Sequence, residues 1–127
     1  MTEHLFKNLD IERVPKPWGY ELIFAHTDRY VGKILHVNKG ESLSLQYHVK
    51  KDETLYVVSG ELLLTIEHEG DRRELSLKQG EAFHIPPLLI HRMLAVVDTD
   101  VAEVSTTELD DVVRLEDRYG RAGTTAK

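Results

Sequence analysis

The sequence predicts an all-β fold, an antiparallel sandwich or barrel, from two observations. Turn-forming residues recur at short intervals, and the runs between them are short and either apolar or alternating, which is typical of such folds. No long helical period competes with this pattern between residues 30 and 106. We expect a single domain over residues 1–127, with a barrel core at about 30–106, an N-terminal arm at 1–29 and a C-terminal helix and tail at 107–127.

Turn signals such as Asn38-Lys39-Gly40 and Glu69-Gly70-Asp71 separate the predicted strands. In chain order the strands are Lys33–Val37, Ser42–Gln46, Leu55–Val58, Leu62–Glu67, Glu74–Leu77, Ala82–Ile85, Met93–Val97 and Val101–Ser105. Residues 14–19 (VPKPWG) contain too much proline for a central strand, so we expect them at an edge. Near the C-terminus, one short helix ended by Gly120 is predicted from the spacing of Leu109, Val112, Val113 and Glu116.

Composition excludes several classes of function. The chain has no cysteine, which excludes disulfides, thiolate metal sites and thiol nucleophiles. Its formal charge is −6, from 16 basic and 22 acidic residues, and no basic stripe is present, so we expect no nucleic-acid partner. No run approaches the ~20 apolar residues of a membrane span, and the N-terminus lacks an apolar signal core, which favours a cytoplasmic protein. A phosphorylated small molecule stays compatible with this charge, because a pocket can be locally basic.

The segment Gly40–Gly60 carries a candidate metal site. Gln46 and His48 are two apart on a predicted strand, so their side chains leave the same face. Glu53 opens the next apolar run, and His91 follows a proline turn about thirty residues later. An ordinary half-buried polar pair is the competing interpretation of Gln46 and His48. Imidazole, carboxylate and amide ligands suit Zn²⁺, Mn²⁺, Fe²⁺, Ni²⁺ or Co²⁺ better than Ca²⁺ or Cu⁺.

These residues fall in a pattern that resembles the cupin superfamily. Its first motif has a glycine, two metal ligands separated by one residue, a glutamate and a closing glycine; its second has a glycine, a proline and a histidine. The matching positions are Gly40, Gln46, His48, Glu53 and Gly60, then Gly80, Pro86 and His91. The resemblance implies an antiparallel jelly-roll barrel with one divalent transition metal, and a homodimer, since such barrels often share edge strands.

The resemblance narrows to the C-terminal domain of type II mannose-6-phosphate isomerases. It rests on PKPWG, SLSLQYH with a glutamate five residues later, YVVSGEL, HIPPLLIHR and DDVVRLEDRYGR. That family has glutamine in place of the first histidine, which is why Gln46 is taken as a ligand. The family usually carries a fused guanylyltransferase domain, and these 127 residues contain no glycine-rich phosphate loop of that kind.

Several positions depart from the family's pattern. Lys51 replaces an arginine that the family associates with catalysis, which keeps the charge and loses the bidentate fork. Thr54 replaces a histidine and cannot act as a base near neutral pH. Leu88 replaces a glycine, from which we expect a different turn beside His91, one that need not have a positive φ. Lys51 and His84 are the candidate catalytic residues.

The leading hypothesis is a sugar-phosphate aldose–ketose isomerase, in which the metal polarises the carbonyl or hydroxyl of the sugar. A binding module without catalysis, for a sugar or small acid, is the second hypothesis, and a metal-dependent oxygenase is the third. Side chains with weaker claims include possible phosphate ligands, a pocket-lining histidine and three aromatic residues at a rim or over the pocket. They are Lys33, Arg92, Arg118, Arg121, His36, Trp18, Tyr20 and Tyr119.

Overall fold

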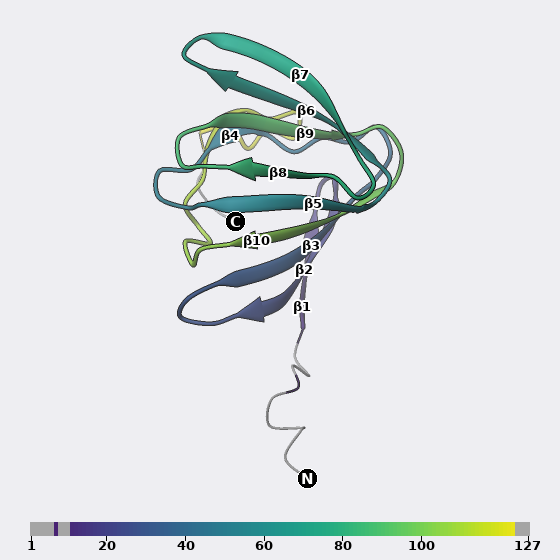
Figure 1. Ribbon diagram of the computed structural model, residues 1–127, viewed down its shortest axis with the longest axis vertical. Helices are drawn as coiled ribbons and strands as arrows, with labels where there is room; N and C mark the ends of the chain where they lie inside the picture. The colour runs from purple at the N-terminus through teal and green to yellow at the C-terminus, as the bar shows by residue number, and fades with distance from the viewer. Residues whose placement is uncertain (1–6, 8–10, 124–127) are drawn as a thin grey trace.

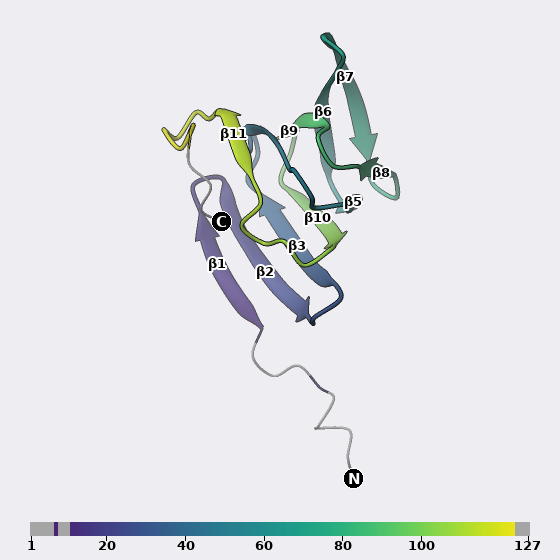
Figure 2. The ribbon, with the colours of Figure 1, turned by 90° about the vertical axis from the view of Figure 1, so that its left-hand side faces the viewer.

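The protein folds into two antiparallel sheets packed face to face (Figures 1 and 2). This computed structural model describes residue 7 and residues 11–123. The six-stranded sheet runs in the order β1 (Glu12–Lys16), β2 (Gly19–His26), β3 (Val31–Val37), β10 (Thr99–Ser105), β5 (Glu53–Ser59) and β8 (Ala82–Ile85). The five-stranded sheet runs in the order β11 (Val113–Glu116), β4 (Leu45–Tyr47), β9 (Ile90–Ala95), β6 (Glu61–His68) and β7 (Asp71–Lys78).

The core lies between the sheets because each strand alternates inward apolar and outward residues. Along β5, for example, Leu55 and Val57 are buried while Tyr56 and Val58 are exposed, as the two-residue period of a strand requires. Both sheets contribute to the buried cluster, which is Trp18, Leu35, Val37, Leu55, Val57, Leu62, Leu64, Leu77, Ile85, Met93, Ala95 and Val101. The predicted all-β class is confirmed.

The expected closed barrel is not formed: within the described residues, no strand pairing joins the two sheets. The edge strands are poor templates for closure. β1 contains Pro15, which has no N–H to donate, and β8 has only four residues before Pro86. β7 exposes Arg72, Arg73 and Glu74. Proline, short length and charge are common ways of blunting a sheet edge.

The predicted C-terminal helix is wrong. Val113–Glu116 form strand β11, which pairs with β4 so that Val113 faces Tyr47 and Arg114 faces Gln46. Burial there has a period of two, since Val112 and Arg114 are buried and Leu115 is exposed. The apparent helical spacing was outweighed by the open edge of β4, whose backbone groups need a partner. Within the described residues there is no helix, and hence none that could cross a membrane.

The N-terminal segment is more structured than an arm. The proline-rich residues lie at an edge as predicted, but β1 and β2 belong to the six-stranded sheet, which therefore begins before residue 30. The other parts of the predicted arm, residues 1–6 and 8–10, and the tail residues 124–127 lie outside the described residues. The homodimer stays a prediction.

Gly60 is required where β5 turns into β6. Its φ is +96°, and a Cβ built there would lie 2.5 Å from Thr99 Oγ1 and 2.6 Å from the Asp98 carbonyl oxygen. Gly70 also has a positive φ, +79°, but a Cβ there would meet open space. We expect Gly60→Ala to lower the free energy of unfolding by about 2–4 kcal/mol, from backbone strain plus a clash. Gly70→Ala should lower it by about 1 kcal/mol, from strain alone.

Urea unfolding of both variants checks this expectation. Equal losses for Gly60→Ala and Gly70→Ala would show that the close approach at Gly60 carries no energetic weight.

Candidate metal centre

The candidate ligands come from both sheets and meet between them. Gln46 on β4 and His91 on β9 are direct partners in the five-stranded sheet, so their side chains share its inner face. His48 follows β4 immediately, and Glu53 opens β5 in the opposite sheet. The short β4–β5 connection therefore carries the chain from one sheet to the other while keeping His48 and Glu53 close.

Three of the four predicted ligands converge. His48, Glu53 and His91 are buried, and one potential ligand atom from each lies within 4.8 Å of the others. His48 Nε2 is 3.0 Å from Glu53 Oε1, and His91 Nε2 is 3.4 Å from the same oxygen. Two nitrogens and a carboxylate oxygen around one point form a set that a divalent transition metal can use.

Backbone carbonyls fix the tautomer of both imidazoles. His48 Nδ1 lies 2.5 Å from the carbonyl oxygen of Asp111, and His91 Nδ1 lies 2.9 Å from that of Leu89. A carbonyl only accepts, so each Nδ1 donates and each Nε2 is turned toward Glu53. His91 Nε2 is buried and has no hydrogen-bond partner. Two ring nitrogens and a carboxylate oxygen that converge on one point fit a cation placed between them.

Gln46 lies beside this cluster, and its role as fourth ligand stays a prediction. Its Oε1 accepts a hydrogen bond from Ser44 Oγ at 2.5 Å. An amide oxygen has two lone pairs, so this bond leaves one of them for another partner. Gln46 and His48 line the same cavity.

Glu53 is held as a carboxylate. Burial alone would raise the pKa of Glu53, but the hydrogen bond to His48, the close contact with His91 and the nearby Lys51 ammonium outweigh burial and hold this pKa well below its usual value. Lys51 Nζ lies 3.4 Å from Glu53 Oε2 and 3.1 Å from Glu103 Oε2. Although burial opposes the charge of Lys51, these two carboxylates raise its pKa. Lys51 therefore stays protonated and is not a general base.

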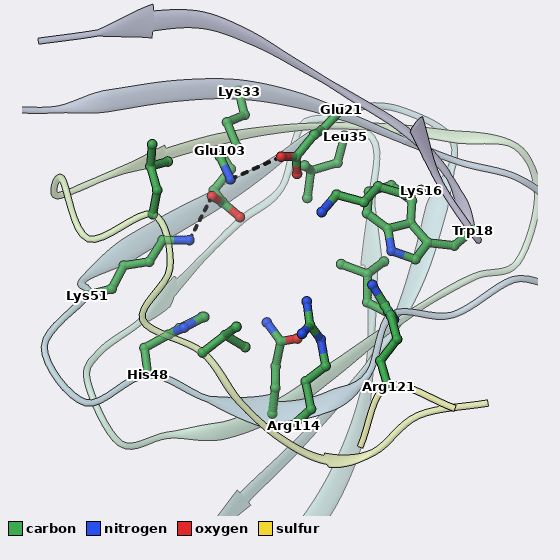
Figure 3. Close-up of a pocket in the computed structure, with 14 residues that line it drawn as sticks. Lys16, Trp18, Glu21, Lys33, Leu35, His48, Lys51, Glu103, Arg114 and Arg121 are labelled. Carbon is green, nitrogen blue, oxygen red and sulfur yellow. Dashed lines mark hydrogen bonds and ion pairs between the residues drawn. The ribbon is translucent and has the colours of Figure 1, made fainter. Parts of the chain in front are cut away.

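A basic cavity adjoins the centre (Figure 3). It encloses about 60 Å³ and opens to solvent. Two lysine–glutamate pairs form part of its wall: Lys51 with Glu103, and Lys33 with Glu21 at 3.5 Å. The other charged lining residues are Lys16, Arg114 and Arg121.

His84, the second candidate catalytic residue, is not in this cavity. Its side chain is 60% exposed, and Nε2 lies 2.6 Å from Asp52 Oδ1. His84 and Thr54 are direct partners on β8 and β5, and they line a separate hollow on the outside of the six-stranded sheet. His36 is also elsewhere, paired with Asp100 at 2.7 Å and stacked on Tyr20.

The remaining predicted residues divide between the cavity and other positions. Lys33, Arg121 and buried Trp18 line the cavity. Arg92 and Arg118 line another hollow, where Arg92 Nη1 is 3.5 Å from Glu116 Oε1 and Arg118 Nη1 donates to the Gly40 carbonyl. Tyr119 packs against the core, and its hydroxyl donates to Glu41.

Sequence reasoning missed five residues that shape the site: Lys16, Glu21, Glu103, Asp111 and Arg114. The two glutamates gave a usable signal, because each is in phase with buried apolar residues on its strand: Glu21 with Ile23, and Glu103 with Val101. Asp111 gave none. Its carboxylate accepts hydrogen bonds from the backbone N–H groups of residues 49, 50 and 51, and its carbonyl orients His48.

Two antiparallel β-sheets with a buried histidine–glutamate cluster between them define a cupin. The family model for the mannose-6-phosphate isomerase C-terminal domain matches residues 7–117, so this chain belongs to that family. Among solved structures, an RmlC-like cupin from Shewanella frigidimarina superposes with a TM-score of 0.66 at 16% identity, covering 77% of this chain and 85% of the other. Oxalate decarboxylase from Bacillus subtilis reaches 0.74 at 17% identity, covering 87% and 31%.

Curated relatives are longer than this chain. Mannose-1-phosphate guanylyltransferase from Escherichia coli is 40% identical over 114 residues, covering 85% of this chain and 23% of the relative. The alginate biosynthesis protein AlgA from Pseudomonas aeruginosa is 30% identical over 134 aligned positions, covering 94% and 27%. The chain thus spans about a quarter of the length of these relatives.

The turn before His91 differs from the sequence expectation. Leu88 has a φ of +73°, so the left-handed turn is kept without glycine. Its N–H donates to the His48 carbonyl at 2.7 Å, which holds the turn in place. A left-handed non-glycine residue costs roughly 1–2 kcal/mol, and the hydrogen bond offsets part of that cost.

Replacing Leu88 should therefore relieve strain. Because Leu88 is 64% exposed and loses little packing, we expect Leu88→Gly to raise the free energy of unfolding by up to about 1 kcal/mol. Val49 is also exposed but lacks a positive φ, so Val49→Gly should lower the free energy of unfolding by about 1 kcal/mol. Chemical denaturation compares the two; similar losses in both would mean that Leu88 is unstrained.

The carboxylate of Asp111 should make the β4–β5 connection sensitive to acid. Burial would raise the pKa of Asp111, but hydrogen bonds from the backbone of Lys50, Val49 and Lys51 outweigh it and lower this pKa. A lowered pKa in the folded state means that the stabilisation is present above the unfolded value of about 3.9 and is lost as pH falls through the folded value.

We expect Asp111→Asn to lower the free energy of unfolding by about 1–2 kcal/mol at pH 7, with the difference from the natural protein shrinking below about pH 4. Urea unfolding of chelator-treated protein at pH 7 and pH 3 measures this. A difference that stays constant with pH would argue against a role for the charge.

Proposed function

We propose that this cupin binds one divalent transition metal and acts on a sugar phosphate as a mannose-6-phosphate isomerase-like domain. The observation that carries the proposal is a buried cluster of His48, Glu53 and His91 beside a cavity with a basic lining. Membership of the mannose-6-phosphate isomerase C-terminal family supports the same substrate class.

The metal would be held by His48, Glu53 and His91, with Gln46 as a fourth ligand. Zn²⁺, Mn²⁺, Fe²⁺, Ni²⁺ and Co²⁺ all suit this donor set. When bound, such an ion supplies Lewis-acid polarisation of a carbonyl or hydroxyl oxygen. The carbonyls of Asp111 and Leu89 keep both imidazoles in the orientation that this binding requires.

The chain's own residues supply charge rather than an obvious base. Protonated Lys51 stabilises negative charge that develops on an oxygen in the cavity. Among the described residues lining the cavity, the carboxylates are Glu21 and Glu103. Glu103 lines the cavity, where it is buried against Lys51, whereas His84 lies outside the cavity and faces solvent. We therefore place proton transfer with these carboxylates rather than with His84.

A second candidate function is ligand binding without turnover. It is favoured by the ion pairs that fix Lys51 between Glu53 and Glu103, since a lysine held in this way cannot exchange a proton at neutral pH. In this alternative the metal and the cavity bind a sugar phosphate and serve regulation or assembly.

Metal analysis with a matched pair of histidine variants tests the proposal. We expect the natural protein to retain about one transition-metal ion per chain after dialysis, and His91→Ala to lose at least about 100-fold in metal affinity. His84→Ala is the control, because His84 lies outside the cavity, and its metal content should be unchanged. Equal metal retention in both variants would contradict the proposed centre.

The metal-loaded protein is then assayed for conversion of mannose 6-phosphate to fructose 6-phosphate. A rate above that of the metal alone, lost in His91→Ala and kept in His84→Ala, supports the isomerase. A rise in melting temperature with mannose 6-phosphate and no turnover selects the binding function instead.

A further inference from the structure

Three cations from separate segments gather at one part of the cavity (Figure 3). Lys16 ends β1, Arg114 lies on β11, and Arg121 follows the C-terminal turn. Arg114 is 7% exposed, and Trp18 lines the same region. The fold therefore brings Lys16 from the N-terminal part of the chain beside Arg114 and Arg121 from the C-terminal part, and gathering like charges costs energy unless opposite charges compensate.

The cavity is positive although the protein is negative. Its lining includes five cations, Lys16, Lys33, Lys51, Arg114 and Arg121, but only two carboxylates, Glu21 and Glu103. The two carboxylates are paired with Lys33 and Lys51, and Arg121 is paired with Asp117, which is not among the lining residues. Within the described part of the chain, no carboxylate lies within ion-pair distance of Lys16. The whole chain has a formal net charge of −6. A local excess of positive charge in an acidic protein favours the binding of an anion in this cavity.

Burial and repulsion from neighbouring cations lower the pKa of two of these groups, Lys16 and Arg114. The pKa of Lys16 is lowered by burial first and by the charges of Lys33, Arg121 and Arg114, against the opposing effect of Glu21. The pKa of Arg114 is lowered by burial and by Arg121, against Asp117. An anion bound among these groups would relieve this repulsion.

Neighbouring residues hold two of the cations in position. Arg121 Nε and Nη2 each lie 3.0 Å from Asp117, which also accepts a hydrogen bond from the Arg121 backbone. The backbone of Arg114 is fixed by the pairing of β11 with β4. The guanidinium groups are donors suited to phosphate oxygens, with Arg121 approached on the side away from Asp117, and Lys16 adds a point charge.

The strand register sets the spacing between these cations and the metal ligands. Arg114 is the direct partner of Gln46, and Gln46 is the direct partner of His91. Directly paired residues share a face, so the three form a row across the inner face of the sheet. Strands lie about 4.8 Å apart, which puts the backbone of Arg114 about 10 Å from that of His91. A ligand that contacts the cations at one end and faces the proposed metal at the other therefore carries its anionic group several bonds away from its metal-facing oxygen.

We propose that Lys16, Arg114 and Arg121 form the subsite for the phosphate of a phosphorylated sugar whose opposite end faces Gln46 and His48. The proposal rests on the proposed function for the metal-facing end, and it adds the residues that select a phosphate monoester. Because the enclosed space of about 60 Å³ is smaller than a hexose phosphate, the flexible Lys16 side chain moves to admit the ligand.

Calorimetric titration of the metal-loaded protein with mannose 6-phosphate, mannose and glucuronate tests the subsite. We expect mannose 6-phosphate to bind at least about 100-fold more tightly than mannose, since the phosphate gains charge-assisted hydrogen bonds. Lys16→Gln and Arg121→Gln should each weaken mannose 6-phosphate binding by about 10-fold and leave mannose binding and metal content unchanged. Arg73→Gln is the control, because Arg73 is exposed on β7 and pairs with Asp71.

Lys16 sits on an edge strand, so its variant is expected to fold, and a melting curve confirms this for both variants. Equal binding of mannose and mannose 6-phosphate, equal binding of glucuronate and mannose 6-phosphate, or unchanged affinity in both cavity variants would overturn the subsite. If the natural protein retains no metal, yet Lys16→Gln still weakens mannose 6-phosphate binding, the subsite stands and the metal-dependent function fails.

Discussion

The buried carboxylate of Glu53 is the group on which the arrangement of the site depends. It belongs to the six-stranded sheet, whereas its partners His48 and His91 come from the five-stranded sheet and the connection that leaves it. An uncompensated buried charge costs several kcal/mol, so the two imidazoles and Lys51 must face Glu53 for the fold to be stable. The electrostatic requirement that stabilises the sandwich at this point also brings the candidate metal ligands together.

The C-terminal strand β11 contributes to the same site from the five-stranded sheet. By pairing with β4, β11 satisfies the open edge of that strand and puts Arg114 beside Gln46. The residues just before β11 bring Asp111 to His48 and to the backbone of the β4–β5 connection. A helix over the same residues could not have done either, because it would leave the edge of β4 unpaired. The segment that the sequence analysis assigned to a short helix is therefore part of the wall and the support of the cavity.

The sequence predicted the all-β class and the convergence of His48, Glu53 and His91, because both depend on local patterns and on motif spacing. It failed at β11, a segment of four residues that is too short for its apolar spacing to distinguish a helix from a strand. Pairing with the edge of β4, which is distant in the sequence, decides in favour of the strand. The sequence also failed at Lys16, Arg114 and Asp111, whose importance arises from contacts across more than sixty residues of chain. Leu88 shows a third limit, because a hydrogen bond to His48 keeps a left-handed turn that residue type alone disfavours.

Side chains along β5 alternate between the inner and the outer face of the sheet. This alternation shows which of the departures at Lys51 and Thr54 lies at the cavity. Glu53 faces inward, so its neighbour Thr54 faces outward and lines the hollow that also contains His84. In this chain a side chain at position 54 does not reach the cavity, and the loss of a histidine there removes no base from it. Lys51 is different, because it is buried beside Glu53 and Glu103. The exchange of arginine for lysine at position 51 keeps a positive charge against the carboxylate of Glu53 but gives up a second, bidentate contact. Of these two departures, the one at Lys51 and not the one at Thr54 is therefore expected to affect chemistry in the cavity.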